Sequence, residues 1–251
     1  MVELDAPVLN GLNRLRAGGF VVLAAAVVTW FVVAPHVHHA GLWTAIAVVA
    51  AGVLPGTLGL VYLALPLARL RWQAIVAVVL ALVVVALVAS ELGWHLVGNF
   101  AKLWAAVFAG WAFLRLFEEL SWVVLVAVII PVVDAISVWR GPTHQITEHH
   151  FSVYTNVSVA FLAPGGGAAY LGPPDILFYG LFLAAAAHWR LRPFWTWFAM
   201  TGMYSFTIVL TNLIDVSGLP ALPFLSFGFL VANADLLWVR LRKPRDAQPE
   251  A

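Results

Sequence analysis

Two aspartates stand inside long apolar segments, where an ionisable side chain is costly and is therefore a candidate for chemistry. Asp134 lies in Ile130-Pro-Val-Val-Asp-Ala-Ile-Ser-Val-Trp139, and Asp175 lies in Leu171-Gly-Pro-Pro-Asp-Ile-Leu-Phe-Tyr179. Two carboxyl groups at close range cannot both ionise cheaply, so one keeps a proton while the other acts as a base. Such a pair can activate a water molecule and protonate the carbonyl oxygen of a peptide bond.

The helices that carry these aspartates should bring them to a similar depth in a membrane. Asp134 lies five residues before the predicted outer end of its helix, which is about 7–8 Å below the interface. Asp175 opens the next helix, after Pro173 and Pro174, which suit a first helical turn. Consecutive membrane helices run in opposite directions, so the two depths match. Because a helix N-terminus favours negative charge, we expect Asp134 to hold the shared proton more often.

The composition makes lipid the solvent of this chain. Hydrophobic residues fill 63% of the 251 positions, and only 10% are charged, against about a quarter in soluble domains. The polar surface is too scarce to coat a water-soluble body. The sequence therefore predicts an all-α, polytopic integral membrane protein that binds no nucleic acid. The absence of cysteine excludes disulfides, thiol catalysis and cysteine-ligated metals.

About eight apolar stretches are long enough, or nearly so, to cross a hydrocarbon core of roughly 30 Å. We place them at Ala17–Ala34, Leu42–Leu67, Trp72–Ser90, Trp94–Leu114, Leu120–Trp139, Tyr170–His188, Phe194–Ile214 and Leu219–Val239. They predict one membrane domain over residues 1–251. Residues 1–119 hold the first four helices, and residues 120–251 hold the last four helices with an outer loop at 140–169.

Basic residues fall on alternate connections, as they do on cytoplasmic loops. They are Arg14, Arg16, Arg69, Arg71, Arg115, Arg190, Arg192, Arg240, Arg242, Lys243 and Arg245. We therefore expect a multi-pass protein of the plasma membrane, with an even number of crossings and both termini in the cytoplasm. Lys102 falls inside the fourth predicted helix.

The outer loop contains two stretches of strand-forming residues. His150-Phe-Ser-Val-Tyr154 and Val157-Ser-Val-Ala-Phe161 flank Thr155-Asn156, which suits a turn, so the segment predicts a short hairpin or an irregular loop. Gly165-Gly-Gly167 predicts a flexible hinge.

Several other polar or special residues have ordinary interpretations. The loop residues His144, Glu148, His149 and His150 lack the spacing of a metal motif, so we predict no metal site and no cofactor. Pro55-Gly56 should break the second span, and Pro131 should kink the helix of Asp134. Asp235 is expected to make a polar contact between helices near the cytoplasmic end.

Three motifs together resemble those of the intramembrane aspartyl proteases, the presenilins and signal peptide peptidases. Val133-Asp134 takes the place of that family's Tyr-Asp, and Gly172-Pro-Pro-Asp175 takes that of Gly-x-Gly-Asp. Leu219-Pro-Ala-Leu-Pro223 contains the family's Pro-Ala-Leu as it stands. Order, spacing and helix placement agree from Ser121 to Lys243. The resemblance implies that Asp134 and Asp175 are the catalytic pair. It implies that the substrate is positioned by Gly172, Pro220, Ala221 and Leu222.

The resemblance also implies a presenilin-like aspartic endopeptidase without a cofactor, acting on transmembrane proteins or peptides within the lipid bilayer. The orientation resembles that of signal peptide peptidases. Since the family usually has nine helices, one N-terminal helix would be missing. Val133 departs from the family's aromatic residue, and Pro174 departs from its second glycine, which stiffens the approach to Asp175.

Two other classes of function remain open. Pro174 supports an inactive, presenilin-like membrane chaperone. A proton-coupled transporter or channel would also place acids at one depth, although it would not require Pro-Ala-Leu. If the chain is a protease, an unwound substrate strand could add to the outer hairpin or to the edge beside Pro220–Leu222. The sequence leaves the substrate and the oligomeric state undetermined.

Overall fold

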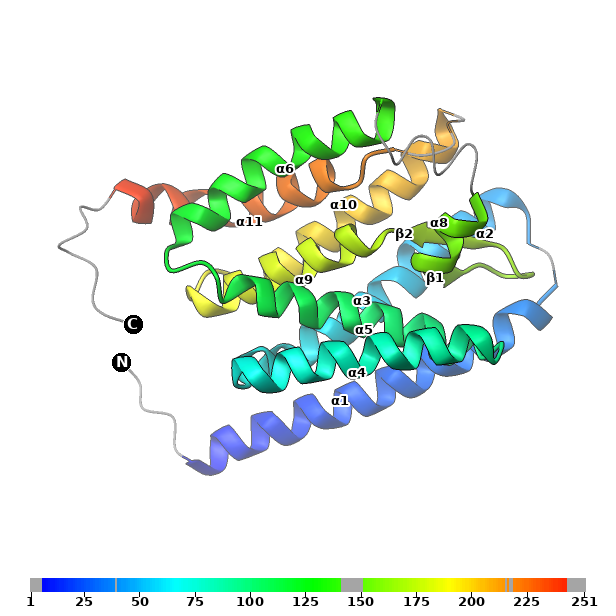
Figure 1. Cartoon of the computed structure of the whole chain (residues 1–251), viewed down its shortest axis with the longest axis horizontal. Helices are drawn as coiled ribbons and strands as arrows, with labels where there is room; N and C mark the ends of the chain where they lie inside the picture. The colour runs from blue at the N-terminus through cyan, green and yellow to red at the C-terminus, as the bar shows by residue number, and fades with distance from the viewer. Residues whose placement is uncertain (1–5, 39, 141–150, 215, 217–218, 243–251) are drawn as a thin grey trace.

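The chain is a bundle of long helices in the computed structural model, which describes residues 6–38, 40–140, 151–214, 216 and 219–242 (Figure 1). Each predicted span overlaps a helix, which confirms a helical membrane protein. Within the described residues, six helical segments are long and apolar enough to cross a membrane: Arg14–His36, Leu42–Leu63, Trp72–Glu91, His95–Leu114, Leu120–Ser137 and Leu222–Arg242.

The α-helices are α1 (Ala6–Val33), α2 (Leu42–Val48), α3 (Leu54–Leu63), α4 (Trp72–Glu91), α5 (His95–Leu114), α6 (Leu120–Arg140), α8 (Phe151–Val157), α9 (Pro173–His188), α10 (Pro193–Leu213) and α11 (Leu222–Arg242). A π-helical turn, η2 (Val49–Val53), joins α2 to α3. Short 3-10 turns follow α1 and α3, at η1 (Ala34–His36) and η3 (Leu65–Arg69). Two antiparallel strands, β1 (Val159–Leu162) and β2 (Ala168–Leu171), form a hairpin.

Arginines join the connections at one end of the bundle. The guanidinium of Arg115 donates to the carbonyl oxygens of Ala68 and Leu70, and that of Arg240 donates to the carbonyl oxygens of Trp189 and Arg190. The start of α1 and the end of α11 lie at this same end (Figure 1). The hairpin, α8 and the start of α9 lie at the opposite end.

The helix α9 is buried in the bundle because glycines let it approach α5 closely. A Cβ atom at Gly110 of α5 would overlap the carbonyl oxygen of Leu177 and lie 2.9 Å from the backbone nitrogen of Leu181. One at Gly180 of α9 would lie 3.0 Å from the carbonyl oxygen of Val107. Small residues of this kind give membrane helices their closest packing. The contact therefore fixes α9, and Asp175 with it, against the N-terminal half of the chain.

The predicted break at Pro55-Gly56 takes the form of a π-helical turn within a continuous span. Pro55 occupies the first turn of α3, and its missing N–H disturbs the bonding of the preceding turn. The turn η2 absorbs this disturbance. The hydroxyl of Ser205 on α10 donates to the carbonyl oxygen of Ala50 at 2.6 Å, which satisfies a backbone group inside the π turn.

The hairpin lies further along the chain than predicted. Thr155-Asn156 belongs to α8, so the predicted turn there is wrong. The turn instead contains Gly165 and Gly166, which have φ values of 84° and 92°. Glycine adopts this left-handed conformation without a steric penalty, and for this reason the glycines predicted as a hinge form the hairpin turn. The predicted strand start, His150, lies outside the described residues.

Candidate active site between helices α6, α9 and α11

The side chain of Asp134 reaches from α6 to the first residue of α11. Its Oδ2 accepts a hydrogen bond from the backbone N–H of Leu222 at 3.0 Å. The first N–H groups of a helix have no partner within that helix, so this carboxylate caps α11. Pro220 and Ala221, which precede the capped residue, are buried. The structure thus joins the first predicted motif to the Pro-Ala-Leu motif.

Asp175 is the third residue of α9 and bonds back to the residue before that helix. Its Oδ2 accepts the N–H of Gly172 at 2.9 Å, as in a helix cap. A Cβ atom at Gly172 would lie 3.3 Å from that oxygen, so glycine leaves room for the carboxylate. Pro173 and Pro174 fill the first two helical positions, where an N–H is not required. The departure at Pro174 therefore costs α9 no hydrogen bond.

The carboxyl groups of Asp134 and Asp175 lie close enough for the charge of one to act on the other. Both residues are half-buried. Each uses one carboxylate oxygen to accept a backbone N–H at a helix start. Because both carboxylates lie at helix starts, the charge preference of a helix N-terminus does not decide which of them holds the shared proton.

A buried tyrosine that the sequence motifs did not indicate holds the backbone of Asp175. The hydroxyl of Tyr204 on α10 donates to the carbonyl oxygen of Asp175 at 2.8 Å. Its ring stacks on that of Tyr179, with 5.9 Å between centroids. The hydroxyl of Tyr179 in turn bonds the Oγ1 of Thr201 at 2.9 Å. The available signal was a set of polar residues within an apolar span, but nothing in their spacing connects them to Asp175.

A second tyrosine approaches the pair from the outer segment. Tyr154 on α8 is half-buried. Burial, then the charges of Asp175 and Asp134, raise the pKa of Tyr154 to about 12. Val133, which takes the place of the family's aromatic residue, is exposed on α6. Aromatic hydroxyls near the pair therefore come from α8 and α10 and not from position 133.

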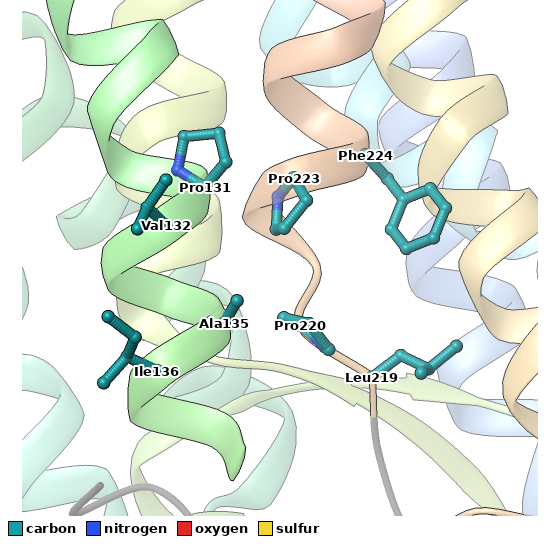
Figure 2. A pocket seen from close by; sticks show the side chains of 8 residues that line it. All are labelled: Pro131, Val132, Ala135, Ile136, Leu219, Pro220, Pro223 and Phe224. Carbon is teal, nitrogen blue, oxygen red and sulfur yellow. The ribbon is translucent and has the colours of Figure 1, made fainter. Parts of the chain in front are cut away.

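An apolar groove of about 510 Å³ lies between α6 and the start of α11 (Figure 2). It is lined by Pro131, Val132, Ala135, Ile136, Leu219, Pro220, Pro223 and Phe224. Pro131 remains within the helix α6 and contributes to this lining. The groove thus adjoins both the turn of α6 that carries Asp134 and the Pro-Ala-Leu segment.

Other acidic residues do not join this site. Asp235 of α11 forms an ion pair at 2.7 Å with Arg192, the residue before α10, as expected for a polar contact between helices. Over the described residues, no group of three or more His, Asp or Glu side chains is placed to hold a metal ion. The four loop residues considered above, from His144 to His150, lie outside those residues.

Comparison of the chain with models of known protein families and with curated proteins found no match. The resemblance to presenilins and signal peptide peptidases therefore depends on the three sequence motifs alone.

Proposed function

We propose that the chain is an intramembrane aspartic endopeptidase that hydrolyses peptide bonds of transmembrane segments with Asp134 and Asp175. One observation carries this proposal. Asp134 is bonded to Leu222 of the Pro-Ala-Leu segment and lies within electrostatic reach of Asp175. Three segments that are far apart in the sequence, each with one motif, thus meet at one site.

The chemistry follows from a pair of carboxyl groups that share one proton. The ionised carboxylate takes a proton from water while the water oxygen attacks the peptide carbonyl carbon. The protonated carboxyl gives its proton to the carbonyl oxygen, and a proton then passes to the amine as the C–N bond breaks. The N–H groups of Gly172 and Leu222 each hold an Oδ2 atom, so the reacting oxygens would be the two Oδ1 atoms.

The proposed topology has eight crossings. The helices α9 and α10 would cross together with the six more apolar segments. The helix α9 needs little lipid-facing surface, because neighbouring helices cover it. The end of the bundle that bears the basic residues would face the cytoplasm. The start of α1 and the end of α11 lie there, so both termini would be cytoplasmic. The catalytic pair would then lie in the outer half of the membrane.

The proposed substrates are transmembrane helices that unwind near the outer face, since a helical peptide bond is enclosed in its own hydrogen bonds. The apolar groove beside Asp134 and Pro220 offers such a helix a lateral approach from lipid. An unwound strand can bind by adding to the hairpin. The strand β2 ends at Leu171, next to Gly172, so a strand added to β2 would run towards Asp175.

The test is cleavage of a single-pass transmembrane substrate in lipid nanodiscs by wild type, Asp134→Asn and Asp175→Asn. The oxygen of an asparagine side chain still accepts the N–H of Leu222 or Gly172, so the helix caps are kept. We expect each substitution to reduce cleavage at least about 1,000-fold. Cleavage that survives either substitution would exclude the carboxyl pair.

A non-catalytic membrane protein with the same arrangement is the second candidate. The specific observation in its favour is that both carboxylates cap helices, a role that needs no chemistry. In that case wild type would cleave no substrate, while Asp134→Ala and Asp175→Ala would each unfold at a lower temperature than the matching asparagine variant.

A further inference from the structure

One edge of β1 pairs with β2, and the backbone groups on its outer edge point away from β2. At the end of the β1–β2 ladder, the N–H of Ala163 donates to the carbonyl of Gly167 at 2.7 Å. Backbone groups of alternate residues point to opposite edges of an antiparallel strand. Those of Ala160 and Leu162 therefore point to the outer edge, and the carbonyl oxygen of Ser158, just before β1, precedes them. The N–H of Ser158 donates to the carbonyl oxygen of Tyr154 in α8.

Asn99 of α5 pairs with this edge as a neighbouring strand would. Its Nδ2 donates to the carbonyl oxygen of Ala160 at 3.0 Å, and its Oδ1 accepts the N–H of Ala160 at 2.8 Å. A carboxamide offers the same donor and acceptor as a peptide group, so one side chain satisfies both backbone groups. Asn99 is itself buried. Another strand would have to break both bonds to pair with Ala160.

Two more side chains donate hydrogen bonds to the carbonyl oxygens on either side of Ala160. One turn along α5, the Nζ of Lys102 donates to the carbonyl oxygens of Ser158 at 2.7 Å and Asn156 at 3.0 Å. The Nε1 of Trp30 on α1 donates to the carbonyl oxygen of Leu162 at 2.9 Å. The outward carbonyls of residues 158, 160 and 162 thus all have donors from α5 or α1. A strand edge satisfied in this way is closed to strand addition.

We propose that Asn99, Lys102 and Trp30 stand in for a third strand and thereby confine an incoming substrate strand to β2, the strand that leads to the catalytic pair. This inference rests on the proposed function. A strand on β2 would lie close to the catalytic pair, because only Gly172 separates β2 from the helix of Asp175. A strand paired with β1 would lie on the far side of the hairpin from one paired with β2, and it would present different peptide bonds to the carboxyl groups.

The role assigned to Asn99 is one of positioning, and it differs from a structural tie in what it predicts. A structural tie would reduce the amount of folded protein without changing which peptide bond is cleaved. A positioning residue also determines the bond that is cleaved and the affinity for substrate. The position of cleavage is therefore the informative measurement.

The first experiment compares Asn99→Leu with wild type. Leucine keeps the shape of the side chain and removes its donor and acceptor. We expect cleavage by the folded variant to spread over neighbouring bonds, mapped by mass spectrometry, and KM to rise on the order of 10-fold. Asn212→Leu is the matched control, since Asn212 is exposed and donates to Ile208 within its own helix. An unchanged product pattern in folded Asn99→Leu would contradict the proposal.

A milder substitution covers the case in which Asn99→Leu does not fold. Trp30→Phe keeps an aromatic ring on α1 and removes the N–H that reaches Leu162. We expect a smaller spread of cleavage sites in the same direction. A folded Trp30→Phe variant with the wild-type pattern and KM would count against the proposal.

The second experiment measures strand placement without catalysis, in an Asp134→Asn background. The chain has no cysteine, so Ala168→Cys on β2 or Leu162→Cys on β1 introduces a single thiol. These residues lie opposite each other in the hairpin, so their side chains share one face. The probe is a transmembrane substrate with one cysteine beside its cleavage region. We expect disulfide formation with Ala168→Cys, and with Leu162→Cys only when Asn99→Leu is added.

Equal reaction at both positions while Asn99 is present, or no reaction at Ala168→Cys, would overturn the inference. Because this experiment needs no cleavage, its failure is separate from a failure of the proposed function, which cleavage by wild type decides.

Discussion

The carboxylate of Asp134 accepts the backbone N–H of Leu222 at 3.0 Å, across 88 residues of sequence. The bond gives one side chain two possible tasks, the capping of α11 and the chemistry of a carboxyl pair. It also orients the carboxylate, since one of its oxygens is held by the backbone of another helix. The first turn of α11 supplies this N–H because it has no partner within the helix.

The two tasks of Asp134 can be separated by paired substitutions. Asp134→Ala removes both the cap and the carboxyl, and it should lower the free energy of unfolding by about 1 kcal/mol. Asp134→Asn keeps an acceptor for Leu222 and should stay closer to wild type in stability. Both variants should lose cleavage. Thermal unfolding in detergent and a cleavage assay measure the two effects, and equal destabilisation by Ala and Asn would contradict the capping role.

Gly172 should matter for space rather than for backbone conformation. Its φ of −67° is open to any residue, but a Cβ atom would lie 3.3 Å from the Oδ2 of Asp175. Gly172→Ala should therefore displace the carboxylate by a few tenths of an ångström and reduce kcat on the order of 10-fold, with little change in melting temperature. Gly202→Ala is the control, because a Cβ atom there meets nothing within 4 Å. Equal kcat values in the two variants would argue against this steric account.

The contact between α5 and α9 should be among the most sensitive to added volume. Gly110→Ala would force a methyl group against the backbone of Leu177 and Leu181, and we expect a loss of about 1–3 kcal/mol in the free energy of unfolding. Gly52→Ala has open space around its Cβ atom and is the matched control. Thermal unfolding of both variants in the same detergent measures the difference. Comparable melting temperatures would show that the helices can separate without cost.

The sequence predicted the helices well because apolar length is a strong and local signal. The span predicted from Leu120 to Trp139 is the helix α6, which differs by one residue at its end. The helix α9 begins three residues later than predicted, at Pro173, because Tyr170 and Leu171 belong to β2. Two of the motifs are in contact in the fold, since Asp134 of α6 accepts the N–H of Leu222 at the start of α11. The charge of Asp134 also acts on Asp175 at the start of α9.

The features that the sequence did not predict depend on contacts between distant segments. The hairpin turn was assigned to Thr155-Asn156, although the glycines at 165 and 166 alone supply the left-handed backbone that the turn uses. Tyr204 reaches the carbonyl of Asp175 from another helix, and Asn99 reaches β1 from the N-terminal half. Such pairs have no periodicity or motif, so only the packing of the helices shows them.

The pKa of Tyr154 tests, without any catalysis, whether its hydroxyl lies near the carboxyl pair. Burial and the charges of Asp175 and Asp134 raise the pKa of Tyr154 to about 12, because a tyrosinate is disfavoured beside negative charge. In Asp175→Asn one of these charges is removed. The pKa of Tyr154 should then fall towards its ordinary value of about 10, and it should remain above that value because burial persists.

The absorbance of tyrosinate during an alkaline titration measures this shift, with Tyr154→Phe as the blank for the other tyrosines. The same raised pKa has a consequence for stability. Below a pH of about 10 the hydroxyl is protonated in both the folded and the unfolded chain, so its ionisation does not change the stability. At higher pH the unfolded chain loses this proton first, which favours unfolding. Tyr154→Phe should therefore retain more of its melting temperature than wild type between roughly pH 10 and 12. A Tyr154 titration that is the same in wild type and Asp175→Asn would place the hydroxyl away from the pair.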